Sequence, residues 1–132
     1  MSDLSALRSE TYINLQTFRR NGQGVPTPVW FVEEGGVLYV RTLARSGKVK
    51  RVRNNPRVRV AACDARGNLK GEWVEAQAWL VGETEAAHAN ELLNRKYGLM
   101  KRAFDLIGWV RKDSYAVIKI TPILNSQSVQ QT

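Results

Sequence analysis

The residues best suited to chemistry in this sequence are cations and hydroxyls gathered in the segment 41–59. Eight basic residues lie there with no acidic residue among them: Arg41, Arg45, Lys48, Lys50, Arg51, Arg53, Arg57 and Arg59. The whole chain has 20 basic and 12 acidic residues and a net charge of +8, so the excess charge comes from this segment. Such a cluster attracts phosphates, polyanionic cofactor tails, nucleic acid or a membrane surface. For any single residue, a solvated surface charge is the alternative.

Part of this segment has the residue types of a phosphate-binding helix start. The residues concerned are Thr42, Ser46, Gly47, Lys48 and Lys50. We predict that Ser46 caps a short helix that ends at Pro56, with Val49 and Val52 facing inward. The first N–H groups of such a helix, with its dipole, favour an anion, and Gly47 allows close backbone approach. A capped surface helix with basic residues accounts for the pattern equally well.

Several kinds of active site are excluded because their residues are missing. The chain has one histidine, His88, and one cysteine, Cys63, which cannot form a catalytic triad, a metal site or an internal disulfide. We expect His88 to be packed or on the surface and Cys63 to be buried in a strand. No Walker, GxGxxG or HExxH motif occurs, and the acidic residues are scattered. We therefore predict no catalytic side chain and no metal, and expect a bound redox cofactor to supply the chemistry.

The elements that must position these residues are mostly short strands. Apolar periodicity and turn residues predict six strands, at 12–18, 25–32, 37–40, 58–62, 73–81 and 114–120. Gly35 and Gly36 provide a tight hairpin turn, Thr84 is the expected cap of a helix that Gly98 stops, and 99–109 is a further helical piece. With no linker or repeat, residues 1–132 are expected to form one mainly β domain, a small antiparallel barrel.

Several motifs resemble the pyridoxamine 5'-phosphate oxidase-like split-barrel family, especially the subgroup described as using the deazaflavin coenzyme F420. They are Thr27-Pro28-Val29-Trp30-Phe31, Tyr39-Val40-Arg41-Thr42, Ser46-Gly47-Lys48-Val49-Lys50-Arg51 and Asn55-Pro56. The resemblance covers most of the chain. It implies a six-stranded antiparallel split β-barrel that forms a homodimer with two cofactor sites at the interface.

The resemblance also implies roles for individual residues. Thr42, Ser46 and Lys48 would contact the cofactor phosphate, whereas Pro28, Val29 and Trp30 would run beside the ring. Gln77 would reach the cofactor from the partner subunit, and Trp73 shares its strand face. The predicted cofactor-binding set is Thr27, Pro28, Val29, Trp30, Arg41, Thr42, Ser46, Gly47, Lys48, Lys50, Arg51, Trp73 and Gln77.

Two departures from the family's pattern narrow the prediction. Pyridoxamine phosphate oxidases proper have an arginine for the flavin phosphate near the start of the second strand, where this chain has Pro26-Thr27-Pro28. They also have Ser-Arg-Lys where this chain has Ser46-Gly47-Lys48. We therefore do not expect vitamin B6 oxidation. The subgroup comparison favours F420, whose phosphate and glutamate tail suit Arg41, Lys48, Lys50 and Arg51, with FMN as the alternative.

The sequence thus predicts an oxidoreductase that uses F420 or FMN to transfer hydride to an unidentified small molecule. A non-catalytic cofactor carrier and a basic nucleic-acid-binding module are the alternatives. A pI near 10.1 and interleaved aromatic residues fit the latter, but no nucleic-acid-binding motif occurs. The apolar runs are short, and residues 1–10 lack the apolar stretch of a secretory signal. We expect a cytoplasmic protein with no nucleic-acid or membrane partner.

Overall fold

The computed structural model describes residues 4–98 and 114–123, so the predicted helical piece 99–109, with Trp109, lies outside the described residues. The described part contains seven strands, two α-helices and a short 3-10 helix. The strands are β1 (Tyr12–Phe18), β2 (Gly24–Trp30), β3 (Val32–Glu34), β4 (Val37–Leu43), β5 (Arg57–Cys63), β6 (Val74–Leu80) and β7 (Tyr115–Pro122). The helices are η1 (Ser5–Leu7), α1 (Gly47–Asn54) and α2 (Glu83–Tyr97). The protein is therefore mainly β, as predicted.

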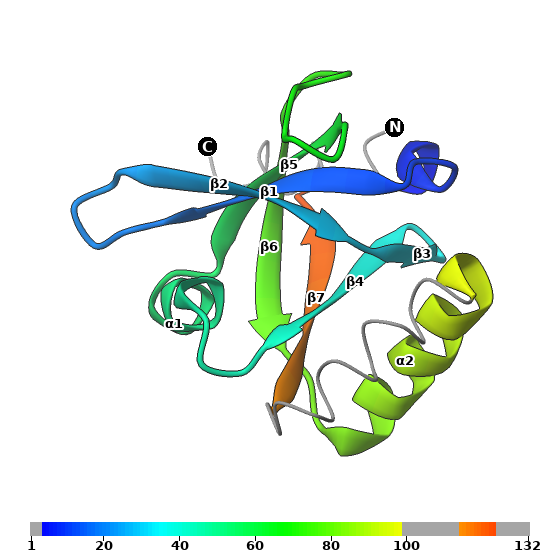
Figure 1. Cartoon of the computed structure of the whole chain (residues 1–132). Coiled ribbons are helices and arrows are strands. Elements are labelled where there is room, and N and C mark those ends of the chain that lie inside the picture. Colours follow the sequence, from blue (N-terminus) through cyan, green and yellow to red (C-terminus); the bar gives the residue numbers. More distant parts are fainter. Residues whose placement is uncertain (1–3, 99–113, 124–132) are drawn as a thin grey trace.

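The strands form one antiparallel sheet in the order β2-β1-β5-β6-β7-β4-β3. Strands β2 and β3 lie at opposite edges of this order, yet only Phe31 separates them in the chain. The sheet must therefore curl until its two edges meet, and Figure 1 shows the resulting barrel-like arrangement. The prediction of six strands was wrong, because the expected strand 25–32 breaks at Phe31 and continues at the other edge of the sheet.

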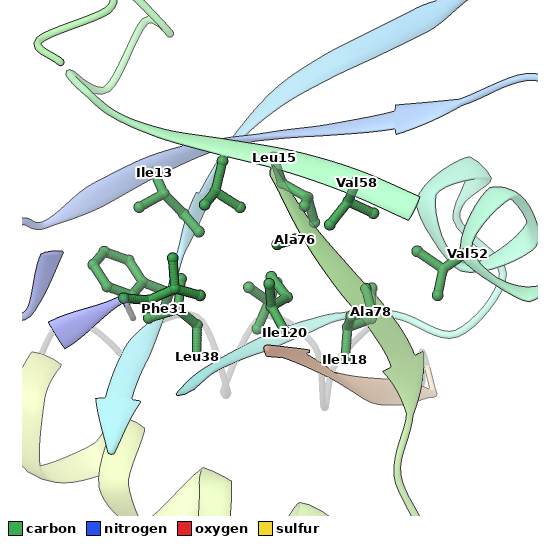
Figure 2. Packing of buried hydrophobic residues seen from close by; sticks show 13 residues of the cluster. Ile13, Leu15, Phe31, Leu38, Val52, Val58, Ala76, Ala78, Ile118 and Ile120 are labelled. Atoms are coloured by element: carbon green, nitrogen blue, oxygen red, sulfur yellow. The ribbon is translucent and has the colours of Figure 1, made fainter. Parts of the chain in front are cut away.

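The core fills the inside of the curled sheet with alternate residues of β1, β4, β5, β6 and β7. Ile13 and Leu15 of β1 and Val58 of β5 are fully buried there (Figure 2). Val60 of β5 is fully buried in the same cluster. The period of two that predicted these strands arises because successive side chains of a strand point to opposite faces. Val52 of α1 joins the same core cluster, so α1 packs against the barrel through its predicted inner face.

The helix ends match the prediction in part. Helix α1 follows Ser46, but the Ser46 side chain makes no capping hydrogen bond. Helix α2 follows Gly82 rather than the predicted Thr84, because the Ala86 N–H already donates to the Gly82 carbonyl. It ends at Gly98, whose φ of 55° is a conformation that glycine adopts readily. The predicted stop of α2 is thus confirmed.

Helix α2 covers the outer face of β3, β4 and β7. A second apolar cluster fills this contact and consists of Val32, Tyr39, Ala89, Leu93, Tyr97 and Val117. The Tyr39 hydroxyl donates to Glu85 Oε2 at 2.7 Å, and Lys119 Nζ lies 3.0 Å from the same oxygen. Burial, followed by this carboxylate, raises the pKa of Tyr39. His88 lies on the surface beside Glu34 and Cys63 is buried, as predicted.

Candidate functional site

A cavity of about 310 Å³ lies where β1, β2, β4 and β7 approach α2. Its lining residues are Tyr12, Pro28, Val29, Trp30, Arg41, Leu93 and Tyr115. The structure thus brings together four residues of the predicted cofactor set, from two strands that are not neighbours in the sheet. Tyr12, Leu93 and Tyr115 were not predicted. Two of these three are aromatic, so the wall suits a flat conjugated ring.

Arg41 is the one charged residue among those lining residues. Its guanidinium lies 3.9 Å from the centroid of the Tyr115 ring. Strands β4 and β7 produce this contact because Arg41 pairs with Val117 and Leu43 pairs with Tyr115. A cation held over an aromatic face is restricted in orientation. The cavity therefore combines an aromatic and apolar wall with a fixed positive charge.

A second group of predicted residues gathers at the start of α1. The Ser46 Oγ atom is buried and has no hydrogen-bond partner within the described residues. Lys48 follows in the first turn of α1, where burial, and then the neighbouring Arg51, lower the pKa of its ammonium group. A buried hydroxyl without a partner costs free energy, and a half-buried lysine beside an arginine is repelled. Both features are relieved by an anion with several acceptor oxygens.

Arg51 is held close to this helix start. Its Nε donates to Thr17 Oγ1 of β1 at 2.6 Å, and the Thr17 side chain is fully buried. A Cβ atom added at Gly47 would lie 2.6 Å from Arg51 Nη1. Glycine at position 47 therefore leaves room for the guanidinium to lie against the first turn of α1. A phosphate fits this donor set of a free hydroxyl, an ammonium and a nearby guanidinium.

The remaining predicted residues lie elsewhere. Thr42 is buried in β4, Thr27 lies on β2 opposite Leu15, and neither lines the cavity. Lys50 is exposed on α1. Trp73 directly precedes β6 and Gln77 lies within it, and neither lines the cavity of this chain.

Part of the positive segment is neutralised by a neighbouring strand. Arg57 Nε lies 3.2 Å from Glu75 Oε1, and Arg59 Nε lies 3.0 Å from Glu75 Oε2. Arg59 also lies over the Trp73 ring, 5.3 Å from its centroid. The segment has no acid within it in sequence, but β6 supplies one through the pairing of Arg59 with Glu75. One carboxylate of β6 thus offsets part of the positive charge of Arg57 and Arg59.

Other kinds of site find no support in the part of the chain that the structure describes. No group of three or more histidine, cysteine, aspartate or glutamate side chains there could hold a metal ion. Among the same residues, no helix has both the length and the apolar character needed to cross a bilayer.

Comparisons with known proteins identify the fold. No family model matches the chain, and no curated protein matches it. Solved structures do match, among them a putative pyridoxamine 5'-phosphate oxidase from Listeria innocua, which is 20% identical with a TM-score of 0.60. That match covers 92% of this chain and 90% of the other.

Two further structures are similar. An F420 reductase is 18% identical with a TM-score of 0.58, over 94% of this chain and 95% of the other. The heme storage protein HutZ from Vibrio cholerae is 12% identical with a TM-score of 0.68, over 89% of this chain and 84% of the other. The chain therefore has the split-barrel fold of pyridoxamine phosphate oxidase-like proteins. At these identities, fold is what the likeness shows.

Proposed function

We propose that this protein is a flavin- or deazaflavin-dependent oxidoreductase that reduces or oxidises a small molecule by hydride transfer. The observation that supports this proposal most is that a short segment joins the aromatic cavity to the polar start of α1. Arg41 lines the aromatic cavity, and Ser46, with its buried and unpartnered Oγ, follows five residues later at the start of α1. A ring bearing a phosphorylated chain needs these two environments within reach of each other.

In this proposal the cavity residues bind and orient the ring. Trp30, Tyr12 and Tyr115 offer aromatic surface, and Pro28, Val29 and Leu93 exclude water. The Arg41 guanidinium supplies a positive charge that stabilises negative charge on ring oxygens or nitrogens. The bound ring supplies hydride transfer, for which no dedicated side-chain acid or base is required.

At the start of α1, Ser46 Oγ would donate to the cofactor phosphate and Lys48 would neutralise part of its charge. We propose F420 as the cofactor and FMN as the alternative. Gly47 accommodates the Arg51 guanidinium, and the exposed Lys50 adds a cation for a longer anionic tail. The F420 reductase among the similar structures supports this choice. Vitamin B6 oxidation is not proposed, because of the departures at Thr27 and Gly47.

We further propose that two copies of the chain form a homodimer through the outer face of β6. Trp79 on this face is 42% exposed, and Gln77 beside it is exposed as well. An exposed tryptophan on a sheet face is typical of a surface that packs against a partner. In the dimer, Gln77 would face the cofactor held by the other copy.

A non-catalytic cofactor carrier is the second candidate. Among the described residues, the seven that line the cavity include no aspartate, glutamate, histidine, cysteine or lysine. Such a lining would hold a ring equally well in a carrier. The nucleic-acid-binding module is less favoured, because Glu75 pairs with Arg57 and Arg59 and reduces their joint positive charge.

Titration of the purified protein with F420, FMN and single-stranded DNA tests these functions. We expect saturable binding of F420, or of FMN, followed by absorbance and fluorescence. Tight, salt-sensitive DNA binding without a response to either cofactor would refute the proposal. If a cofactor binds, stopped-flow mixing of its reduced form with candidate acceptors separates an enzyme from a carrier, since a carrier leaves the cofactor reduced.

A further inference from the structure

The break between β2 and β3 is fastened by the last turn of α2. Within the described residues Phe31 belongs to no strand ladder, because β2 ends at Trp30 and β3 begins at Val32. The Phe31 N–H donates to the Tyr97 hydroxyl oxygen at 3.0 Å, and this hydroxyl lies 2.7 Å from the Phe31 carbonyl. One side chain therefore satisfies both backbone groups of a buried residue that has no strand partner.

The same tyrosine contacts the wall of the cavity from behind. Its ring stacks on Trp30 with centroids 4.4 Å apart and an angle of 8° between the planes. Trp30 lines the cavity, whereas Tyr97 does not. The Tyr97 hydroxyl can also donate to the Thr11 carbonyl at 2.8 Å, next to the start of β1. Since it has a single proton, the Thr11 and Phe31 carbonyls share it.

Lys96 holds the other side of the break. Its Nζ lies 3.6 Å from the centroid of the Phe31 ring and is buried without a hydrogen-bond partner among the described residues. Burial lowers the pKa of this ammonium to about 8. The Phe31 ring is fully buried in the core. Phe31 is therefore held by Lys96 over its ring and by Tyr97 at its backbone.

We infer that Tyr97 is a positioning residue for the ring-binding wall, acting through Trp30 and the backbone of Phe31. Three contacts of this side chain lie at the point where the chain crosses from β2 to β3, and a fourth reaches the Thr11 carbonyl beside the start of β1. Strand β2 ends at this crossing, and its last residues, Pro28, Val29 and Trp30, line the cavity. The backbone geometry at Phe31 therefore determines how these side chains face the cavity. This inference rests on the proposed function for one point, that the ligand in contact with the wall is a cofactor ring.

The test uses Tyr97→Phe, which removes the hydroxyl and keeps the ring that stacks on Trp30. We expect cofactor affinity to fall by about tenfold, which corresponds to the loss of one or two positioning contacts. The protein is also labelled with 5-fluorotryptophan, and the Trp30 resonance is assigned by its absence in Trp30→Phe. In Tyr97→Phe we expect this resonance to shift or broaden while those of Trp73 and Trp79 stay unchanged.

Amide hydrogen exchange of the parent protein provides a measurement without any substitution. We expect the Phe31 amide to be protected, because it donates to a buried hydroxyl, and to lose this protection in Tyr97→Phe. A Phe31 amide that exchanges freely in the parent, or an unchanged Trp30 resonance in the variant, would overturn the inference. Failure of the proposed function shows differently, as a parent protein that binds neither F420 nor FMN while the Trp30 and Phe31 signals still respond.

Discussion

Replacing Ser46 by alanine should affect the free protein and its cofactor binding in opposite ways. An ordinary N-cap serine stabilises its helix through its side chain, and its loss costs about 1 kcal/mol. Ser46 occupies the N-cap position of α1 without that hydrogen bond, and its Oγ is buried with no partner in the described part of the chain. Ser46→Ala removes an unsatisfied polar atom. We therefore expect unfolding free energy to stay constant or rise by up to about 1 kcal/mol.

Cofactor binding should weaken in the same variant. If Ser46 Oγ donates to the phosphate, its loss removes a hydrogen bond to a charged group, worth about 1.5 to 3 kcal/mol. The dissociation constant should then rise by about 10- to 100-fold. Ligands that lack the phosphate isolate this term. Riboflavin is the phosphate-free partner of FMN, and the deazaflavin chromophore without its phosphate is that of F420. Each phosphate-free ligand should bind Ser46→Ala as tightly as it binds the parent.

Urea unfolding of the cofactor-free protein, followed by circular dichroism, and calorimetric titration of both ligands measure the two effects. Thr84→Ala is the matched control, because it deletes an exposed hydroxyl in the first turn of α2, the other helix. It should leave both ligands unaffected. The reasoning is refuted if Ser46→Ala loses about 1 kcal/mol of stability, as an ordinary cap would. It is also refuted if phosphorylated and phosphate-free ligands weaken equally.

Three further predictions concern cations around the site. Lys48→Ala should weaken F420 or FMN binding by about tenfold, with a smaller effect at high salt, in titrations at two ionic strengths; unchanged affinity would contradict the proposed phosphate contact. Thr17→Val leaves the Arg51 guanidinium without its 2.6 Å partner and should lower the unfolding free energy by about 1 to 3 kcal/mol in urea, whereas a neutral result would show that Arg51 finds water instead. Burial lowers the pKa of Lys96 in the folded protein from 10.5 to about 8. Between pH 8 and 10.5 the unfolded chain therefore binds more protons than the folded one, and the free energy of unfolding should rise with pH. We expect a rise of about 1 to 3 kcal/mol relative to Lys96→Met. If the free energies of unfolding of the two proteins change in parallel from pH 7 to 10, this linkage is excluded. The charges that face Lys96 are Glu10 and Glu33, which raise its pKa against the effect of burial.

Much of the secondary structure could be predicted because local patterns report which side chains are buried. The first strand is observed at the predicted residues 12–18, and α1 buries Val49 and Val52 as expected. The break at Phe31 could not be predicted, since 25–32 reads as one apolar run. Its cause lies far away in the chain, in the Tyr97 hydroxyl that replaces a strand partner.

The candidate site was predicted in the same uneven way. Pro28, Val29, Trp30 and Arg41, all in the predicted cofactor set, line one cavity, whereas Thr27 and Thr42 do not. That these residues bind a cofactor stays a prediction. Tyr12, Leu93 and Tyr115 were missed because they come from three separate elements and no sequence spacing relates them. The one available signal was their aromatic or apolar character, which core residues share.

By itself, the sequence determined the mainly β character, the faces of the strands, and the positive segment 41–59, which contains α1. These properties depend on neighbouring residues, whose periodicity and charge are visible in one dimension. Only the tertiary structure decided that Glu75 pairs with both Arg57 and Arg59, that the sheet has seven strands, and that the Trp30 ring stacks on Tyr97. Strand order, register and curl bring such residues together, and these are set by packing across the whole barrel.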